Sequence, residues 1–200
     1  VIDVSGAFRL KHNSYSSWYG FEHTEKDLLA HANYGLNPWA QPAKNKLIAN
    51  PGCYATSVLM ALIPLLKSDL LDTASIVVDA KSGTTGGGKK AAENLLYSEV
   101  DGECLPYKIG KHQHYPEIQE YLNQFSGKNI DFHFSTSLLA ARRGIISSIF
   151  AKLNAGVTET DIENAFAKHY SDVPMVKFGS LKNNPQFASL KKVVGTNNTL

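Results

Sequence analysis

The chain has 200 residues, 43% of them hydrophobic and 19% charged, which excludes a disordered tail, a collagen-like fibre and a long coiled coil. Twenty Lys and Arg residues against 18 Asp and Glu residues give a net charge of +2, too balanced to indicate a nucleic-acid partner. No apolar run is long enough to predict a membrane span, and two cysteines make no disulfide framework, so we expect a cytoplasmic protein. The sequence opens on Val1 inside an apolar run, and we interpret it as part of a longer protein.

Strand and helix patterns alternate along the chain. Short apolar runs rich in β-branched residues predict strands at residues 1–4, 76–80, 130–139 and 144–153. Helical patterns cover residues 25–32, 54–66, 90–99, 116–125 and 158–170, the last capped by Thr158 or Thr160. We therefore expect an α+β (mixed α/β) fold in a single domain over residues 1–200.

Cys53 lies close to a predicted helix start. Asn50 is a good N-cap and Pro51 suits the first helical position, which makes Cys53 the third helical residue. There the free backbone N–H groups and the helix dipole would favour the nucleophilic thiolate, and the N–H groups could also bind an oxyanion formed on an attacked carbonyl. The alternative is a small buried apolar side chain, as for most free cysteines; Cys104 has no such helix start. Pro64 within the same helix predicts a kink or an end.

Two histidines provide groups for proton transfer. His112 and His114 are two residues apart, so in an extended segment both side chains project to the same side. Histidine titrates near neutral pH and suits proton transfer to and from a thiol. With Glu117, the pair could instead supply three ligands of a zinc site, although the spacing is not that of the helical zinc protease motif. Packing or surface histidines are the simplest alternative.

A glycine-rich loop and two arginines could meet an anion. Residues 83–89 fit the P-loop pattern G-x-x-x-x-G-K, but Lys90 stands where a magnesium-binding Ser or Thr is required. We therefore favour a glycine loop close to a substrate over an NTPase, with an ordinary strand–helix turn as the alternative. Arg9 and Arg143 carry planar guanidinium groups suited to a carboxylate or a phosphate, although isolated arginines are more often surface charges.

Seven segments of the chain, taken in order, closely resemble the catalytic domain of the N-acetyl-gamma-glutamyl-phosphate reductase family. The segments are residues 4–9, 18–20, 34–36, 50–56, 82–89, 112–118 and 143–145. The most specific is the N-P-G-C-Y-x-T motif of residues 50–56, followed by the H-x-H-x-P-E motif of residues 112–117. The chain is more distantly similar to aspartate-semialdehyde dehydrogenase, which shares the mechanism and the two-domain plan.

The resemblance implies a fold like the C-terminal catalytic domain of glyceraldehyde-phosphate dehydrogenase, a mixed sheet packed with helices, without the family's Rossmann domain. It implies that Cys53 is the nucleophile and that His112 or His114 transfers protons, with His112 our first choice. The residues that it implies in substrate binding are Arg9, Glu117, Arg143, Ser82 and Gly83. It also implies that Gly86, Gly87 and Asn197 contact NADP. Most of the NADP site would lie on a domain outside this chain.

The implied activity is reduction of N-acetyl-glutamyl phosphate by NADPH to N-acetyl-glutamate semialdehyde and phosphate, through a thioester on Cys53, in arginine biosynthesis. We expect the chain alone to be inactive, because most of the NADP site would lie elsewhere. The implied partners are the small acyl phosphate or semialdehyde and further copies of the chain in a dimer or tetramer, with no nucleic acid, membrane or metal. Three alternatives remain: an aspartate-semialdehyde dehydrogenase, a cysteine hydrolase without a nicotinamide, and a non-catalytic binding module.

Overall fold

The computed structural model describes residues 1–40 and 45–200, and the chain divides into two compact units. The first unit comprises Val1–Ile63 and Lys111–Ile130, and the second comprises Pro64–Gly110 and Asp131–Leu200. The division falls inside helix α3, Cys53–Lys67, so the start of this helix belongs to the first unit.

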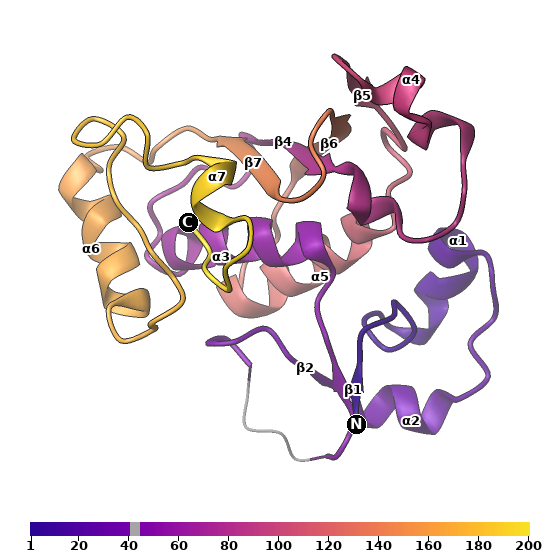
Figure 1. The fold of residues 1–200 in the computed structure, drawn as a ribbon. Helices are drawn as coiled ribbons and strands as arrows, with labels where there is room; N and C mark the ends of the chain where they lie inside the picture. Colours follow the sequence, from indigo (N-terminus) through magenta and orange to yellow (C-terminus); the bar gives the residue numbers. More distant parts are fainter. Residues whose placement is uncertain (41–44) are drawn as a thin grey trace. The chain divides into compact units, whose positions relative to one another are not determined.

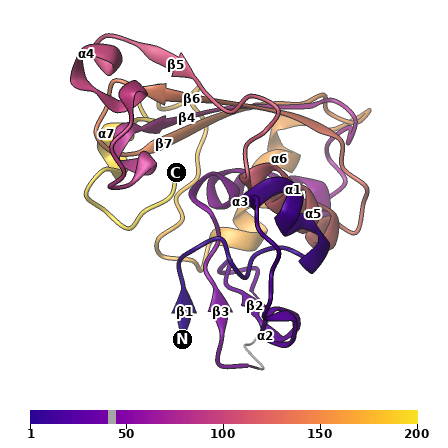
Figure 2. The same ribbon diagram turned by 90° about the vertical axis from the view of Figure 1, so that its right-hand side faces the viewer.

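The first unit contains a small parallel sheet. Its strands are β1 Ile2–Asp3, β2 Asn33–Tyr34 and β3 Ile48–Ala49, and β3 lies between the other two (Figure 2). Its helices, besides the start of α3, are η1 His12–Ser14, α1 Tyr15–Tyr19, α2 Lys26–His31 and α5 His114–Ser126 (Figure 1). Tyr34 pairs with Ala49 in the parallel register, so the sheet places Tyr34 beside the loop of residues 50–52 that leads into α3.

Helix α3 is buried on nearly every side, as its apolar sequence predicts. Its largest fully buried side chains are Tyr54, Leu59, Leu62, Ile63 and Leu66. Of the kink or end predicted at Pro64, the end is wrong, because the helix continues through this residue to Lys67. The proline removes one backbone hydrogen bond, whereas the apolar surface that the helix buries stabilises every turn.

The predicted start of this helix is also wrong. Helix α3 begins at Cys53, and both Asn50 and Pro51 lie in the preceding loop. The side-chain amide of Asn50 donates a hydrogen bond to the carbonyl oxygen of Pro51 (3.1 Å) and therefore does not cap the helix. Cys53 is consequently the first helical residue, and its backbone N–H is one of those without a partner inside the helix.

The second unit is built on a four-stranded mixed sheet of order β5–β6–β4–β7. The strands are β4 Ile76–Gly83, β5 Cys104–Pro106, β6 Phe132–Leu139 and β7 Ile145–Phe150. Strands β4 and β6 run parallel, β7 pairs antiparallel with β4, and β5 pairs antiparallel with β6. Figure 2 shows β4, β6 and β7 almost edge-on as one sheet. Along β4, Ile76, Val78 and Ala80 are buried while Val77 is exposed, so one face of the sheet lies on the core.

Short helical segments follow the strands of the second unit. They are η2 Thr84–Gly87, η3 Glu93–Leu95, α4 Tyr97–Val100, α6 Glu159–Tyr170 and α7 Leu190–Val193; α6 is orange and α7 yellow in Figure 1. Thr158 caps α6, because its hydroxyl accepts the N–H of Asp161 while the Asp161 carboxylate accepts the N–H of Thr158. Of the two capping threonines considered from the sequence, Thr158 is the cap.

The α+β class is confirmed, and the predicted strands and most predicted helices are present with shifted ends. The helix predicted over residues 90–99 is wrong, because this region forms only η3 and α4. Nearly all side chains there are exposed, and a helix with no buried face is marginal at that length. Within residues 1–40 and 45–200, no helix combines the length and the apolar character needed to cross a bilayer.

Candidate active site

Cys53 presents its side chain at the exposed start of α3. Although part of the residue reaches solvent, desolvation by the atoms packed around its sulfur raises the pKa of the thiol. The backbone N–H groups of Tyr54 and Cys53 lower this pKa by a smaller amount. The helix start thus favours the thiolate in the expected direction, but desolvation outweighs it and the net pKa is raised.

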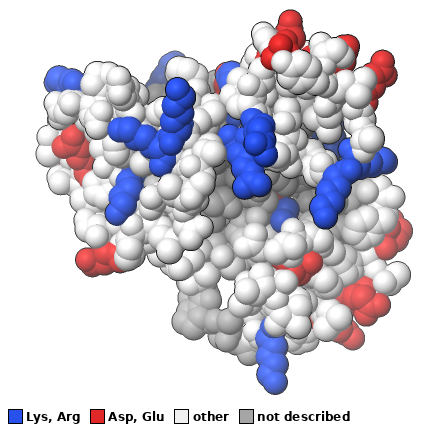
Figure 3. Space-filling model, viewed as in Figure 1, with Lys and Arg blue, Asp and Glu red and all other residues white. Residues whose placement is uncertain are grey.

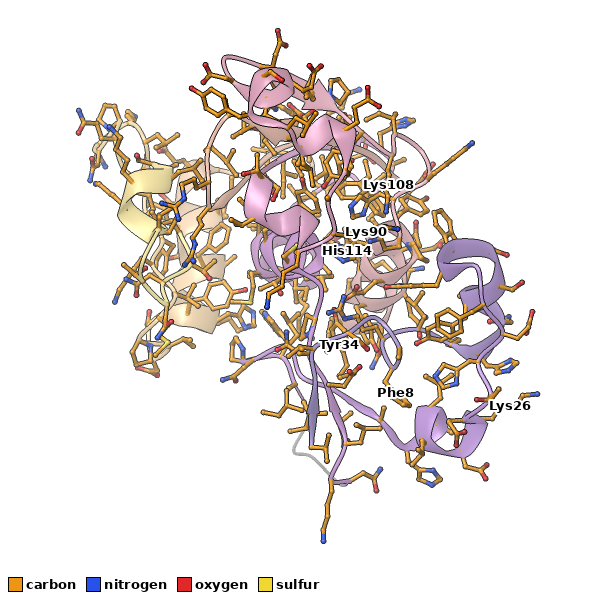
Figure 4. All side chains as sticks on the ribbon, turned by 45° about the vertical axis from the view of Figure 1, so that its right-hand side comes forward. Phe8, Lys26, Tyr34, Lys90, Lys108 and His114 are labelled. Carbon is orange, nitrogen blue, oxygen red and sulfur yellow. The ribbon has the colours of Figure 1, made fainter. Side chains whose placement is uncertain are left out.

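His114 is the histidine that lies against the cysteine loop. A Cβ added to Gly52 would lie 2.6 Å from His114 Nε2, so the imidazole packs directly on the backbone of the residue before Cys53. His114 is buried and is the first residue of α5; its side chain is labelled in Figure 4. The absence of a side chain at Gly52 thus lets an imidazole nitrogen lie against the backbone of the residue before Cys53.

His112 has a different environment. Its Nδ1 accepts a hydrogen bond from the backbone N–H of His114 (3.1 Å), and its ring packs edge-on against Tyr54, with centroids 5.2 Å apart. The two imidazole centroids lie 4.8 Å apart. The segment is a turn that enters α5 and not the extended segment we expected, yet it brings the two rings together. His112 therefore orients the turn, while His114 faces the cysteine loop.

Arg9 and Glu117 form a buried pair behind this loop. Glu117 is fully buried, Arg9 is 7% exposed, and Arg9 Nη1 lies 3.7 Å from Glu117 Oε2. Arg9 Nε donates to the carbonyl oxygen of Asn50 (2.7 Å), and the backbone N–H of Gly52 donates to Glu117 Oε1 (2.7 Å). The two residues therefore hold the loop of residues 50–52 from both of its ends.

Tyr34 also contacts the Arg9–Glu117 pair, and the sequence analysis did not assign it a role. Its hydroxyl donates to Glu117 Oε1 (2.8 Å), and its ring stacks on Tyr121, with centroids 3.4 Å apart. Burial raises the pKa of Tyr34, so its hydroxyl keeps its proton and acts as the donor. Burial also raises the pKa of Glu117, whereas Arg9, the Gly52 N–H and the Tyr34 hydroxyl lower it. Only the occurrence of Tyr34 in a resembling segment pointed to it, because 83 residues separate it from Glu117.

The glycine loop and Arg143 belong to the second unit. The N–H of Gly83 donates to the carbonyl oxygen of Gly144 (2.9 Å), and those of Thr84 and Thr85 donate to the carbonyl oxygens of Ala141 and Arg142. A Cβ on Gly83 would lie 2.8 Å from the backbone N of Arg143, which explains the glycine. The expectation that the loop's N–H groups are open to an anion is therefore wrong for residues 83–85.

The remaining candidates of the second unit are exposed or lie near its surface. Gly86 lies over the buried Ser82, whose Oγ would be 2.7 Å from an added Cβ, and Gly87 lies against Leu95. Arg143 is exposed in the turn between β6 and β7, and Asn197 is exposed after α7. Lys and Arg side chains gather over α7 and near this turn in Figure 3. Strand β4 is followed by η2 and not by the long helix that a P-loop needs, so the NTPase reading has no support.

In the part of the chain that the structure describes, no three His, Cys, Asp or Glu side chains come together as a possible metal site. His112, His114 and Glu117 accordingly form no ligand cluster, because Glu117 is directed to Tyr34 and the backbone of Gly52. The first unit thus places the His114 imidazole and the Arg9–Glu117 pair against the loop of residues 50–52, which leads directly into Cys53.

Comparison with known proteins identifies close relatives. The N-acetyl-gamma-glutamyl-phosphate reductase of Streptococcus thermophilus is 42% identical over 199 residues, covering 100% of this chain and 57% of the relative. The enzyme of the same name from Staphylococcus saprophyticus is 38% identical over 200 residues, covering 98% of this chain and 57% of the relative. The chain thus spans just over half the length of these curated relatives.

The fold is shared with a solved structure, aspartate semialdehyde dehydrogenase II from Vibrio cholerae. The TM-score is 0.59 at 13% identity, over 88% of this chain and 54% of that one. Residues 53–200, from the candidate nucleophile to the end, match the family described as "Semialdehyde dehydrogenase, dimerisation domain". The chain therefore belongs to the semialdehyde dehydrogenase dimerisation-domain family.

Proposed function

We propose that residues 1–200 form the catalytic and dimerisation domain of a longer two-domain N-acetyl-gamma-glutamyl-phosphate reductase. This enzyme would reduce N-acetyl-glutamyl phosphate to N-acetyl-glutamate semialdehyde and phosphate, a step of arginine biosynthesis. The observation that carries the proposal is that the His114 imidazole packs against Gly52, the residue directly before the exposed Cys53. The identity of 38–42% with relatives that bear this enzyme's name supports the choice of substrate.

In the proposed reaction, Cys53 Sγ attacks the acyl carbon of the substrate while His114 Nε2 takes the thiol proton. The base is needed because the pKa of the thiol is raised, so little thiolate is present at neutral pH. The bond between the acyl carbon and the phosphate oxygen breaks, phosphate leaves, and a thioester to Cys53 remains. NADPH, when bound, supplies the hydride that reduces this thioester. Collapse of the resulting tetrahedral alkoxide breaks the bond between the acyl carbon and Cys53 Sγ and releases the semialdehyde, and His114 returns its proton to the Cys53 thiolate.

Several residues of the second unit are proposed to contact the ligands. Arg143 would pair with the phosphate or the carboxylate of the substrate, because it is an exposed guanidinium. Gly83, which packs on the backbone of Arg143, and Ser82 before it are buried and would lie beneath the same site. Gly86 and Gly87 are exposed and carry no side chains, so the flat ring of a nicotinamide could approach their backbone closely. Asn197 is an exposed side-chain amide that could bind a polar group of the same cofactor.

The proposed enzyme is a homo-oligomer, a dimer or a tetramer, and the family description "dimerisation domain" supports its self-association. The face of the sheet opposite the core offers the contact surface, since Val77 is 40% exposed and its cross-strand neighbour Phe150 is 63% exposed. We expect Phe150→Glu to lower the molecular mass measured by light scattering, and an unchanged mass would exclude this face. Both cysteines are free, which fits a reducing compartment such as the cytoplasm.

The activity is tested on the full-length protein by NADP- and phosphate-dependent oxidation of N-acetyl-glutamate semialdehyde, beside aspartate semialdehyde. We expect Cys53→Ser to abolish the reaction and Cys104→Ser, which alters the other exposed cysteine, to preserve it. Retained activity in Cys53→Ser would exclude the assignment. Faster oxidation of aspartate semialdehyde would favour the second candidate, a dehydrogenase for that substrate, as in the Vibrio cholerae enzyme of the same fold. Product formation without a change in NADPH absorbance would indicate a cysteine hydrolase.

A further inference from the structure

Two hydrogen bonds join Tyr34, through Glu117, to the backbone of Gly52, the residue before the proposed nucleophile. Tyr34 ends strand β2, and its hydroxyl donates to Glu117 Oε1 at 2.8 Å. The same oxygen accepts the N–H of Gly52 at 2.7 Å, and Gly52 is joined directly to Cys53. Figure 4 labels both Tyr34 and His114, which mark the two ends of this group of residues.

The backbone of Gly52 is the common support of the nucleophile and the base. His114 packs on Gly52, so a displacement of this residue moves Cys53 and changes its distance from the imidazole at the same time. The hydrogen bond from the Gly52 N–H fixes the loop only while the accepting Glu117 carboxylate is itself held in place. Glu117 Oε1 accepts two hydrogen bonds, whereas Oε2 accepts none and lies 3.7 Å from Arg9 Nη1.

We propose that Tyr34 is a positioning residue for the Cys53–His114 pair, acting through the Glu117 carboxylate. The proposal rests on the function proposed above and adds a residue to its site. Without the Tyr34 hydroxyl, the carboxylate keeps one hydrogen-bond donor on Oε1 and can turn toward the guanidinium of Arg9. The Gly52 N–H then loses its fixed acceptor, and the cysteine loop is free to shift.

The ring of Tyr34 has a separate, structural role. It stacks on Tyr121 with an interplanar angle of 10°, and a phenylalanine preserves this contact. Tyr34→Phe therefore removes the hydrogen bond to Glu117 and leaves the packing intact. Tyr115→Phe is the matched control, because it also removes a hydroxyl hydrogen bond from a half-buried tyrosine, in this case to Gln119 on the same helix.

The experiment measures kcat and KM of the full-length enzyme with N-acetyl-glutamate semialdehyde, phosphate and NADP. We expect Tyr34→Phe to lower kcat about tenfold with little change in KM, since the reacting groups are misplaced and substrate binding is not. We expect Tyr115→Phe to behave as the wild type. The double variant Tyr34→Phe/Glu117→Gln should be no slower than Glu117→Gln alone, because Tyr34 acts through Glu117.

Four outcomes would overturn the proposal: a wild-type kcat in Tyr34→Phe, a rise in KM without a fall in kcat, additive losses in the double variant, or failure of Tyr34→Phe to fold. The last outcome would show that the hydroxyl serves stability. A Cys53→Ser variant assayed in parallel separates the two levels of inference. If Cys53→Ser is active, the proposed function fails; if it is inactive while Tyr34→Phe behaves as the wild type, only the positioning role fails.

Discussion

The contact between Gly52 and His114 predicts a large effect of one added methyl group. In Gly52→Ala, the new Cβ would lie 2.6 Å from His114 Nε2 and 2.8 Å from its Cδ2 and Cε1. Ordinary contacts between such atoms are about 3.5 Å, so the imidazole must move by roughly 1 Å. The backbone at Gly52 does not have a positive φ, so alanine adds bulk without backbone strain. A displacement of this size between reacting groups lowers kcat on the order of 100-fold, and the overpacking destabilises the fold by about 1–3 kcal/mol.

The assay compares kcat of Gly52→Ala, His114→Ala and the double variant in the full-length enzyme. If the alanine acts by moving the imidazole, the double variant is no slower than His114→Ala alone. Gly179→Ala is the matched control, since a Cβ there would meet Phe187 at an ordinary 3.6 Å. A kcat of Gly52→Ala within about twofold of the wild type would refute the placement of His114, and with it the identity of the base.

Two further predictions follow from the pKa of Cys53 and from the cap of α6. Because the pKa of the Cys53 thiol is raised, we expect iodoacetamide to alkylate it slowly at neutral pH. The rate should still increase with pH beyond the ordinary cysteine pKa of about 8.5. A rate that has levelled off by pH 7 would contradict this. Thr158→Ala removes the capping box and should lower the free energy of unfolding, measured by urea denaturation, by about 1 kcal/mol. Thr160→Ala, two residues further on, should have little effect. Equal losses in the two variants would contradict the assigned cap.

The sequence predicts features that depend on neighbouring residues. The apolar length of α3 and the β-branched runs of β6 and β7 have local patterns, and these elements are present. The proposed nucleophile and the histidines also have local signals, since Cys53 follows Pro-Gly and the histidines are two residues apart. Elements of two residues such as β2 and β3 have no periodicity, so only their pairing with each other reveals them.

The contacts that complete the site join distant residues and have no local pattern. The Tyr34 hydroxyl meets Glu117 across 83 residues, and Arg9 meets the carbonyl of Asn50 across 41. Sequence inspection cannot place such partners, because each of them is an ordinary surface residue type until the fold buries it. The net pKa of Cys53 is hidden for the same reason: the helix start that lowers it is visible in the sequence, whereas the burial of the sulfur that raises it more depends on the fold.

The Arg9–Glu117 pair acts on the geometry of the cysteine loop more than on its electrostatics. At the Cys53 thiol the positive charge of Arg9 lowers the pKa and the negative charge of Glu117 raises it, so the two effects oppose each other. Desolvation therefore keeps the thiol protonated in spite of a buried guanidinium nearby. A variant that loses only one charge removes this balance: Glu117→Gln should lower the pKa of the thiol, and Arg9→Met should raise it. Both residues hold the cysteine loop in place through their hydrogen bonds, whereas only the Glu117 charge adds to the desolvation that keeps the Cys53 thiol protonated.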